Sequence, residues 1–362
     1  MSREPLTIER GLARAERSIA LIERCRPLGA RTECARLAEA WKRGQELDPA
    51  WSFAPLVDLG GLRASLEAIA TRTEKWEGVF PLLAARAREL AIEAELAEQI
   101  GAHRFEVHAA RRFPVDAGVD GDQALSWARQ WAWDRGGRDA GDGIASDDES
   151  NTQSLISLMR QAVGERRLPF RVVVRPDLVS LAATGDGVIV IRSGARLLGS
   201  ESERIVRHEV DGHAMPRARA KRERLGIFAV GTAVGSDDEE GRALLIEQRA
   251  GCLGTERRAE LGQRHLAALA VKRGANFVET VRLLRRLGTA IDPAIAISMR
   301  VHRGGGLARE IVYLTALARV TRHFAADPAA EDLLERGRIA VAAVPLLREI
   351  ELAHAASLTA AE

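Results

Sequence analysis

The residues best suited to chemistry are two histidines and a glutamate in the segment RHEVDGH, residues 207–213. Zinc-protease helices usually carry their histidines four residues apart, as H-E-x-x-H, because that spacing points both rings at one metal. Here His208 and His213 are five residues apart, which separates their side chains by about 140° in an ideal α-helix. A local π-turn returns them to one face, and Gly212 lowers the steric barrier to such a turn. The segment predicts a widened metal-binding helix; the alternative is a chance pair of one exposed and one buried histidine.

A catalytic zinc site takes three protein ligands and keeps a fourth position for water. The segment SDDEEGRALLIEQRAG, residues 236–251, offers a carboxylate as the third ligand. We interpret Ser236 and Glu239 as a capping box that opens a helix, which leaves Glu240 free to bind the metal. Glu247 lies two turns further on the same face and is predicted to orient a ligand histidine. The alternative is a solvated acidic helix start that complements the helix dipole.

Most of the chain is predicted to be helical, because Ala, Leu, Arg and Glu dominate and aromatic residues make up only 4% of it. The exception is residues 169–193, where β-branched residues alternate around a Gly-Asp-Gly turn. We expect a mainly α protein with a small antiparallel β-sheet (α+β) beside a zincin-like active-site helix. The strand at 188–192 either pairs with an extended peptide by edge addition or lies inside the sheet.

Capping signals predict where several helices begin. Three segments have a Ser or Asn followed three residues later by Glu, the pattern of a capping box. Asp-Pro pairs predict two further helix starts near the C-terminus. The predicted starts are Ser200 with Glu203 for a helix that stops before Pro216, Ser236 with Glu239 for a helix to about residue 258, Asn276 with Glu279, Asp292-Pro293 and Asp327-Pro328.

The chain of 362 residues is long enough for one large domain or two of medium size. A stretch rich in Gly, Asp and Ser at 135–152 is the predicted loop or linker. We therefore expect an N-terminal helical lobe at 1–134 and a metallopeptidase lobe at 153–362. Within the second lobe, the small sheet precedes the metal helices at 200–258 and a set of C-terminal helices.

Composition excludes several classes of partner. The 53 basic and 51 acidic residues nearly cancel, so no nucleic-acid partner is expected. No apolar stretch is long enough to span a membrane, and the N-terminal sequence does not resemble a signal peptide. Three cysteines without a C-x-x-C pair favour a reducing compartment, so we expect a cytoplasmic protein. The sequence leaves the oligomeric state open.

Four segments, in this order, resemble one family: HEVDGH (208–213), EEGRALLIE (239–247), FVETVRLLRRLG (277–288) and SMRVHRGGGLAREIVYLTAL (298–317). The family comprises the bacterial flavohaemoglobin expression-modulating QEGLA-motif proteins and the eukaryotic microtubule-associated tyrosine carboxypeptidases. The match runs from about residue 169 to 324 and is weaker upstream. The Q-E-G-L-A motif reads E-E-G-R-A here, with Glu239 and Arg242 in place of glutamine and leucine, so substrate preference need not transfer. The same segment is similar to the E-E-x-R-A-E segment of dipeptidyl-peptidase III.

The resemblance implies a zinc-dependent metallopeptidase of carboxypeptidase type, whose substrate is a peptide or protein C-terminus. It implies one Zn²⁺ ion held by His208, His213 and Glu240, with Glu209 as the catalytic base that takes a proton from the zinc-activated water. Two other functions remain open. One is that of a zinc amidase acting on a small non-peptide substrate, and the other is that of a non-catalytic helical regulatory protein.

The R-G-G-G segment adds three candidates on either side of the glycines. Tyr313, the single tyrosine of the chain, is the candidate donor to the oxyanion; the alternative is a core aromatic residue with a satisfied hydroxyl. Arg300 and Arg303 are candidates for binding the substrate carboxylate, since a guanidinium forms two parallel hydrogen bonds with it. The alternative for both arginines is a place on the surface.

Overall fold

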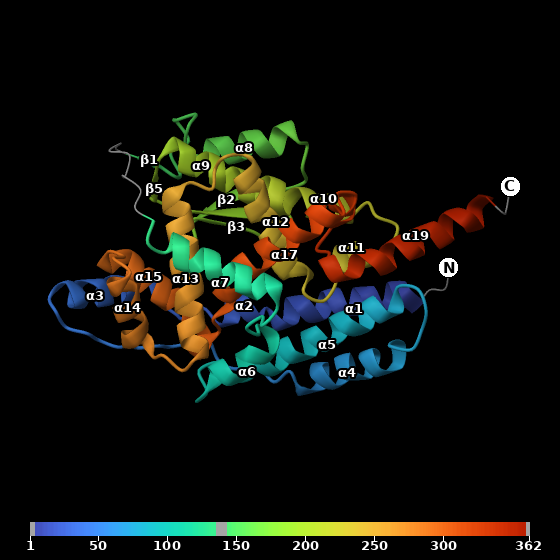
Figure 1. Ribbon diagram of the computed structural model, residues 1–362, viewed down its shortest axis with the longest axis horizontal. Coiled ribbons are helices and arrows are strands. Elements are labelled where there is room, and N and C mark those ends of the chain that lie inside the picture. Colours follow the sequence, from blue (N-terminus) through green and yellow to red (C-terminus); the bar gives the residue numbers. More distant parts are fainter. Residues whose placement is uncertain (1–3, 135–142, 360–362) are drawn as a thin grey trace.

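The computed structural model describes residues 4–134 and 143–359, and these form a mainly helical protein with two small sheets (Figure 1). The first helices are α1 (Glu4–Ile19), α2 (Leu21–Arg24), α3 (Ala30–Lys42), α4 (Gly60–Thr73), α5 (Phe80–Ala97), α6 (Phe105–Arg112), α7 (Val119–Trp131) and α8 (Leu155–Glu165). The strands are β1 (Ile144–Ala145), β2 (Arg171–Arg175), β3 (Ala182–Thr184), β4 (Val188–Arg192) and β5 (Arg196–Leu197). The predicted fold class is confirmed.

The helices after the strands carry the candidate site and the C-terminal packing. They are α9 (Gly199–Val206), the π-helix η1 (Arg207–Ala214), α10 (Met215–Ala220), α11 (Ile227–Val230), α12 (Gly235–Arg249), α13 (Thr255–Lys272), α14 (Phe277–Arg286), α15 (Ile291–Val301), the short turn α16 (Arg303–Gly306), the 3₁₀ turn η2 (Arg309–Ile311), α17 (Val312–Ala326), α18 (Ala330–Leu334), the 3₁₀ turn η3 (Val341–Ala343) and α19 (Val344–Thr359). Among the described residues, no helix combines the length and the apolar composition needed to cross a membrane.

The larger sheet has three strands in the order β2-β4-β3. The predicted hairpin is present, because β3 pairs antiparallel with β4. The expectation of a purely antiparallel sheet is wrong: β2 pairs parallel with β4, which the chain reaches only after forming β3. The central position of β4 also decides between the two alternatives for residues 188–192, since both of its edges are already paired and it lies inside the sheet.

Two hydrophobic cores hold these elements together. The larger core combines N-terminal helices with those after η1, for example Leu12 of α1 and Leu90 of α5 with Leu244 of α12. Figure 1 shows α1, α4 and α5 lying side by side below the sheet region. The second core packs the sheet against α8, α9 and η1, with Ile189 and Val210 among its members. The division into lobes at 134 and 153 stays a prediction, and part of the predicted linker, residues 135–142, lies outside the described residues.

One predicted capping box is confirmed and two are wrong. Asn276 and Glu279 exchange their hydrogen bonds at the start of α14, both at 2.9 Å. By contrast, α9 begins at Gly199, where Glu201 accepts a hydrogen bond from the Leu198 amide. Helix α12 begins at Gly235, after a left-handed residue, and ends at Arg249 rather than near 258. The predicted stop before Pro216 is also wrong, because proline fits the first turn of α10, where its missing N–H is not needed.

Candidate metal centre

The helix that carries RHEVDGH is widened, as its five-residue spacing predicts. Residues Arg207–Ala214 form the π-helix η1, which continues from α9 and runs into α10. The rings of His208 and His213 lie on one side of it, with their centroids 5.0 Å apart. The prediction of a local π-turn is therefore confirmed, and the π-helix itself brings the two histidines together.

Arg242 of α12 supports this distorted turn. Its guanidinium is buried and donates to the backbone carbonyls of Asp211, at 3.5 Å, and Gly212. The Asp211 side chain is held in turn by Arg166, the residue directly after α8, at 2.8 Å. The leucine-to-arginine departure in the Q-E-G-L-A motif therefore places a cation against the backbone of the π-helix.

Two glycines let α12 approach its neighbours closely enough to deliver the third side chain. A Cβ added to Gly212 would lie 2.7 Å from the Ala243 Cβ of α12, closer than real Cβ contacts occur. A Cβ added to Gly241 would lie 2.8 Å from the Ala316 Cβ of α17. Glu240 precedes the second glycine, so these contacts bring it between η1 and α17.

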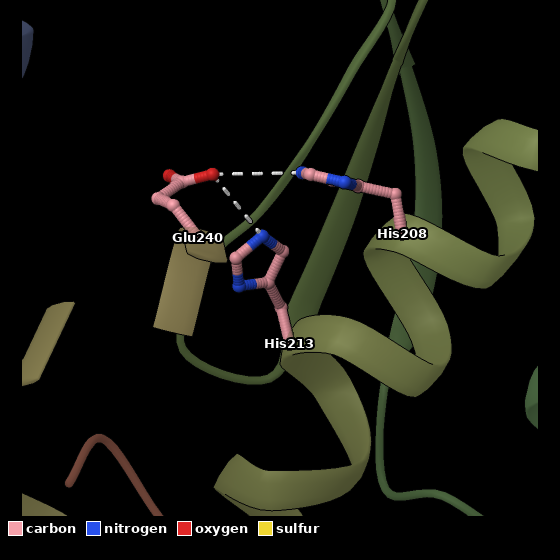
Figure 2. Close-up of side chains that lie close together, drawn as sticks. All are labelled: His208, His213 and Glu240. Atoms are coloured by element: carbon pink, nitrogen blue, oxygen red, sulfur yellow. Dashed lines mark ion pairs between the residues drawn. The ribbon is translucent and has the colours of Figure 1, made fainter. Parts of the chain in front are cut away.

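Three side chains converge in front of the π-helix, as Figure 2 shows. The Nε2 atoms of His208 and His213 lie 3.5 and 3.8 Å from the same oxygen, Oε2 of Glu240. One possible ligand atom from each residue lies within 4.8 Å of the others. Ligand atoms about 2 Å from a tetrahedral zinc ion lie roughly 3.3 Å apart. These three side chains could hold a metal ion, and the described residues contain no other such group of three His, Cys, Asp or Glu side chains.

Each histidine has a second carboxylate behind it. Nδ1 of His208 is hydrogen-bonded to Oε1 of Glu247 at 2.7 Å, and Glu247 is fully buried. Nδ1 of His213 lies 3.1 Å from Oε2 of Glu239. The hydrogen bond to Glu247 fixes the orientation of the His208 ring and leaves its Nε2 to face a metal. Nδ1 of His213 forms no hydrogen bond with the described residues, so Glu239 contributes its negative charge there. The position of Glu247 fits the role predicted for it, whereas Glu239 was wrongly assigned to a helix cap.

The charges of the cluster favour a bound cation. Burial lowers the pKa of His208, but Glu240 and Glu247 outweigh it and raise that pKa to about 10. Burial raises the pKa of Glu240, yet Arg309 and the two histidines hold it well below its usual range. Without a metal ion, the neighbouring carboxylates favour a proton on His208. With both imidazoles neutral, the two rings and the Glu240 carboxylate form a donor set that suits a divalent ion.

Glu209, next to the first histidine, is held from the sheet. Its side chain is 8% exposed, and Oε2 accepts a hydrogen bond from the Thr184 hydroxyl at 2.7 Å. The same hydroxyl lies 3.1 Å from the Glu209 carbonyl oxygen. The Thr184 carbonyl accepts from Arg217 of α10 at 2.6 Å. Sequence analysis missed Thr184, because only the packing of β3 against η1 brings it here.

Tyr313 lies on the other side of Glu240, linked to it by an arginine that sequence analysis also missed. Arg309 donates to Oε1 of Glu240 at 3.1 Å and to the Tyr313 hydroxyl at 3.3 Å. Arg300 donates to the same hydroxyl at 3.2 Å. Burial and Glu240 raise the pKa of Tyr313, but its arginine neighbours outweigh them and the net pKa is lowered. The hydroxyl is therefore held close to the three candidate ligands.

The two predicted substrate arginines share an internal partner. Arg300 and Arg303 both donate to Oε1 of Glu310, at 2.7 and 3.2 Å, and the Glu310 side chain is fully buried. Neither arginine is a free surface residue. Part of their charge is compensated within the protein, and Arg300 remains the more accessible of the two.

The fold and the site define the class: a mainly helical protein with an H-E-x-x-x-H helix and a zincin-like His-His-Glu cluster that could hold a metal ion. The chain belongs to the microtubule-associated tyrosine carboxypeptidase family, whose model matches residues 42–358. This match confirms the resemblance that the sequence motifs indicate, and the family is one of peptidases.

Other comparisons bear on the fold alone. A solved structure described as a lipoprotein from Colwellia psychrerythraea superimposes with a TM-score of 0.50 at 12% identity, covering 93% of this chain and 75% of that chain. No curated protein matches the sequence significantly.

Proposed function

We propose that the protein is a zinc-dependent metallopeptidase that hydrolyses the last peptide bond of a peptide or protein with a free C-terminus. The observation that carries this proposal is the convergence of His208, His213 and Glu240, with both Nε2 atoms facing one carboxylate. Membership of a carboxypeptidase family supports the reaction class. When bound there, zinc would supply Lewis acidity, which lowers the pKa of a water molecule and polarises the scissile carbonyl.

Glu209 is the base in this proposal. Its carboxylate adjoins a ligand histidine in the chain and is fixed in one orientation by the Thr184 hydroxyl. It takes the proton from the attacking water and passes it to the leaving amine. A carboxylate held on one oxygen by a neutral donor keeps its other oxygen for that transfer.

Tyr313 is the donor to the developing oxyanion. Its hydroxyl is fixed between Arg300 and Arg309, and the lowered pKa makes it a stronger hydrogen-bond donor than a free phenol. A preorganised donor of this kind stabilises charge that appears only in the transition state. Arg300 and Arg303 supply the positive charge that attracts the substrate's terminal carboxylate.

The zinc amidase alternative has less support. It rested on two polar residues beside the site, Glu239 and Arg242. Glu239 lies behind His213, and Arg242 donates to the π-helix backbone, so both contact the helix that carries the candidate ligands. The non-catalytic alternative also has less support, because a purely structural metal site has no need of a base such as Glu209.

A cytoplasmic location, inferred from the three cysteines, belongs to this proposal.

The test combines metal content with product analysis. We expect about one zinc per chain by elemental analysis. A peptide library digested by the zinc-loaded protein should lose residues from the C-terminal end, read by mass spectrometry. The family name makes a terminal tyrosine the first residue to test. Absence of stoichiometric zinc, or internal cleavage that ignores the terminus, would refute the proposal.

A further inference from the structure

The buried guanidinium of Arg264, on α13, has two N–H donors without a hydrogen-bond partner among the described residues. Its side chain is 4% exposed, and its one carboxylate contact is a 3.5 Å pair between Nη1 and the half-exposed Glu260. Nε and Nη2 are buried and have no acceptor among the described residues. Buried donors are normally satisfied, because leaving them unpaired costs free energy. Two unsatisfied donors on one guanidinium point to a ligand that supplies the acceptors.

The unpaired atoms lie on the same side of the guanidinium. Nε–H and Nη2–H project in parallel, and this edge is the one that forms two hydrogen bonds with the two oxygens of a carboxylate. A single backbone carbonyl or hydroxyl would satisfy only one of them. The geometry therefore favours a carboxylate as the missing partner over a neutral group.

Arg264 packs against the ring of Tyr313, which Arg309 links to the candidate metal centre. Its guanidinium carbon lies 4.5 Å from the centroid of the Tyr313 ring. The hydroxyl of the same tyrosine accepts from Arg309, which also donates to Glu240. Tyr313 and Arg309 thus connect Arg264 to the three converging side chains.

The surrounding charges leave room for one more anion. Burial lowers the pKa of Arg264, and the neighbouring Arg300 lowers it further. Lys272, about two turns further on and at the end of the same helix, is partly buried and its Nζ has no hydrogen-bond partner among the described residues. Arg300 and Arg303 already donate to Glu310. Among these arginines, Arg264 is the one with a complete bidentate edge still unused.

We propose that Arg264 binds the terminal carboxylate of the substrate through Nε and Nη2, and so restricts the enzyme to free C-termini. This inference rests on the proposed function and refines it, because it moves the carboxylate contact from Arg300 and Arg303 to Arg264. The latter two then supply charge and fix Tyr313. A site that pairs its buried donors with a carboxylate rejects a terminal amide, since the amide leaves them unpaired.

Kinetics on matched substrates test the proposal. The zinc-loaded protein is compared with Arg264→Gln, using one peptide with a free C-terminus and the same peptide as its amide. We expect the variant to raise KM for the free acid about 10- to 100-fold and to lose most of the preference for acid over amide. Arg258→Gln, on the same helix but paired with Asp134, is the matched control and should behave as wild type. A variant that keeps the full preference would overturn the proposal.

Binding and stability provide readouts that do not need turnover. Isothermal titration with N-acetyltyrosine and N-acetyltyrosinamide, on zinc-loaded and metal-free protein, should show tighter binding of the acid in wild type and no preference in Arg264→Gln. If wild type hydrolyses no peptide yet prefers the acid, the proposed function fails while the Arg264 assignment stands. Equal binding of acid and amide by wild type would refute the assignment.

Thermal unfolding separates a binding role from a structural one. A buried cation without a full complement of acceptors is unfavourable in the empty protein, so Arg264→Gln should keep or raise the Tm. A large drop would indicate a structural role and count against the proposal. Arg264→Lys retains the charge without the bidentate edge, and it should also lose the preference for acid over amide.

Discussion

Gly212 of the π-helix and Ala243 of α12 touch so closely that a methyl group at position 212 would lie 2.7 Å from the Ala243 Cβ. This contact sets the distance between the helix with the two histidines and the helix with Glu240. The geometry of the candidate site therefore depends on the absence of a side chain at position 212 as well as on the three candidate ligands.

Gly212→Ala should push η1 and α12 apart. We expect a loss of about 1–3 kcal/mol in the free energy of unfolding, as for other overpacked contacts, and weaker zinc binding because the ligands no longer converge. Urea denaturation and competition with a chelator measure the two effects. Ala243→Gly removes the clashing methyl, so the double variant should recover most of both losses. An unchanged loss in the double variant would mean that the clash is not the cause.

Glu247→Gln should weaken zinc binding while leaving the ligands in place. The neutral amide still contacts Nδ1 of His208 but no longer strengthens it as a ligand. Loss of such a partner typically costs about 10- to 100-fold in metal affinity. Chelator competition gives the number, and Glu256→Gln, an exposed position on α13, is the control. Wild-type affinity in Glu247→Gln would argue that this carboxylate serves only the neighbouring Arg257, with which it also pairs.

Glu209→Gln should separate metal binding from catalysis. The amide can still contact Thr184 but cannot accept the proton of water, so kcat should fall about 10²- to 10⁴-fold while the zinc content stays at that of wild type. Elemental analysis and steady-state kinetics on one peptide decide this. Glu203→Gln, an exposed residue of α9, should leave both unchanged. Retained turnover in the Glu209 variant would show that another group acts as the base.

Glu16 of α1 should make the fold sensitive to acid. Burial raises its pKa, but Arg338 and Arg86 outweigh burial and lower that pKa to about 2. A lowered carboxyl pKa contributes stability above the unfolded value near 4.5, and this contribution disappears as the pH falls towards 2. Glu16→Gln should therefore cost about 2 kcal/mol at pH 7 and progressively less below pH 4.5.

Urea denaturation of wild type and Glu16→Gln between pH 3 and 7 measures this dependence. Glu4→Gln on the same helix is the control, because its ion pair with Arg72 is long and exposed and such pairs contribute little. A stability difference between wild type and Glu16→Gln that is independent of pH would contradict the assignment of the lowered pKa to Glu16.

The sequence by itself determined the features that depend on spacing along one segment. The five-residue spacing of His208 and His213 required a π-turn, since no regular helix points both rings at one place. The capping box of Asn276 and Glu279 is equally local, with both partners within one turn of chain. Glu240 was selected because Glu239 was assigned to a capping box; that assignment is wrong, but the family resemblance implies the same residue.

Only the tertiary structure decided which residues surround these ligands. Glu239 has the spacing of a capping residue, yet His213 and Arg217 from neighbouring helices compete for its carboxylate. Thr184 and Arg309 reach the site from strand β3 and the 3₁₀ turn η2, and no periodicity links them to the histidines. The parallel pairing of β2 with β4 is likewise non-local. Spacing along a chain encodes local geometry, whereas contacts between distant elements follow from packing of the whole core, which no single segment specifies.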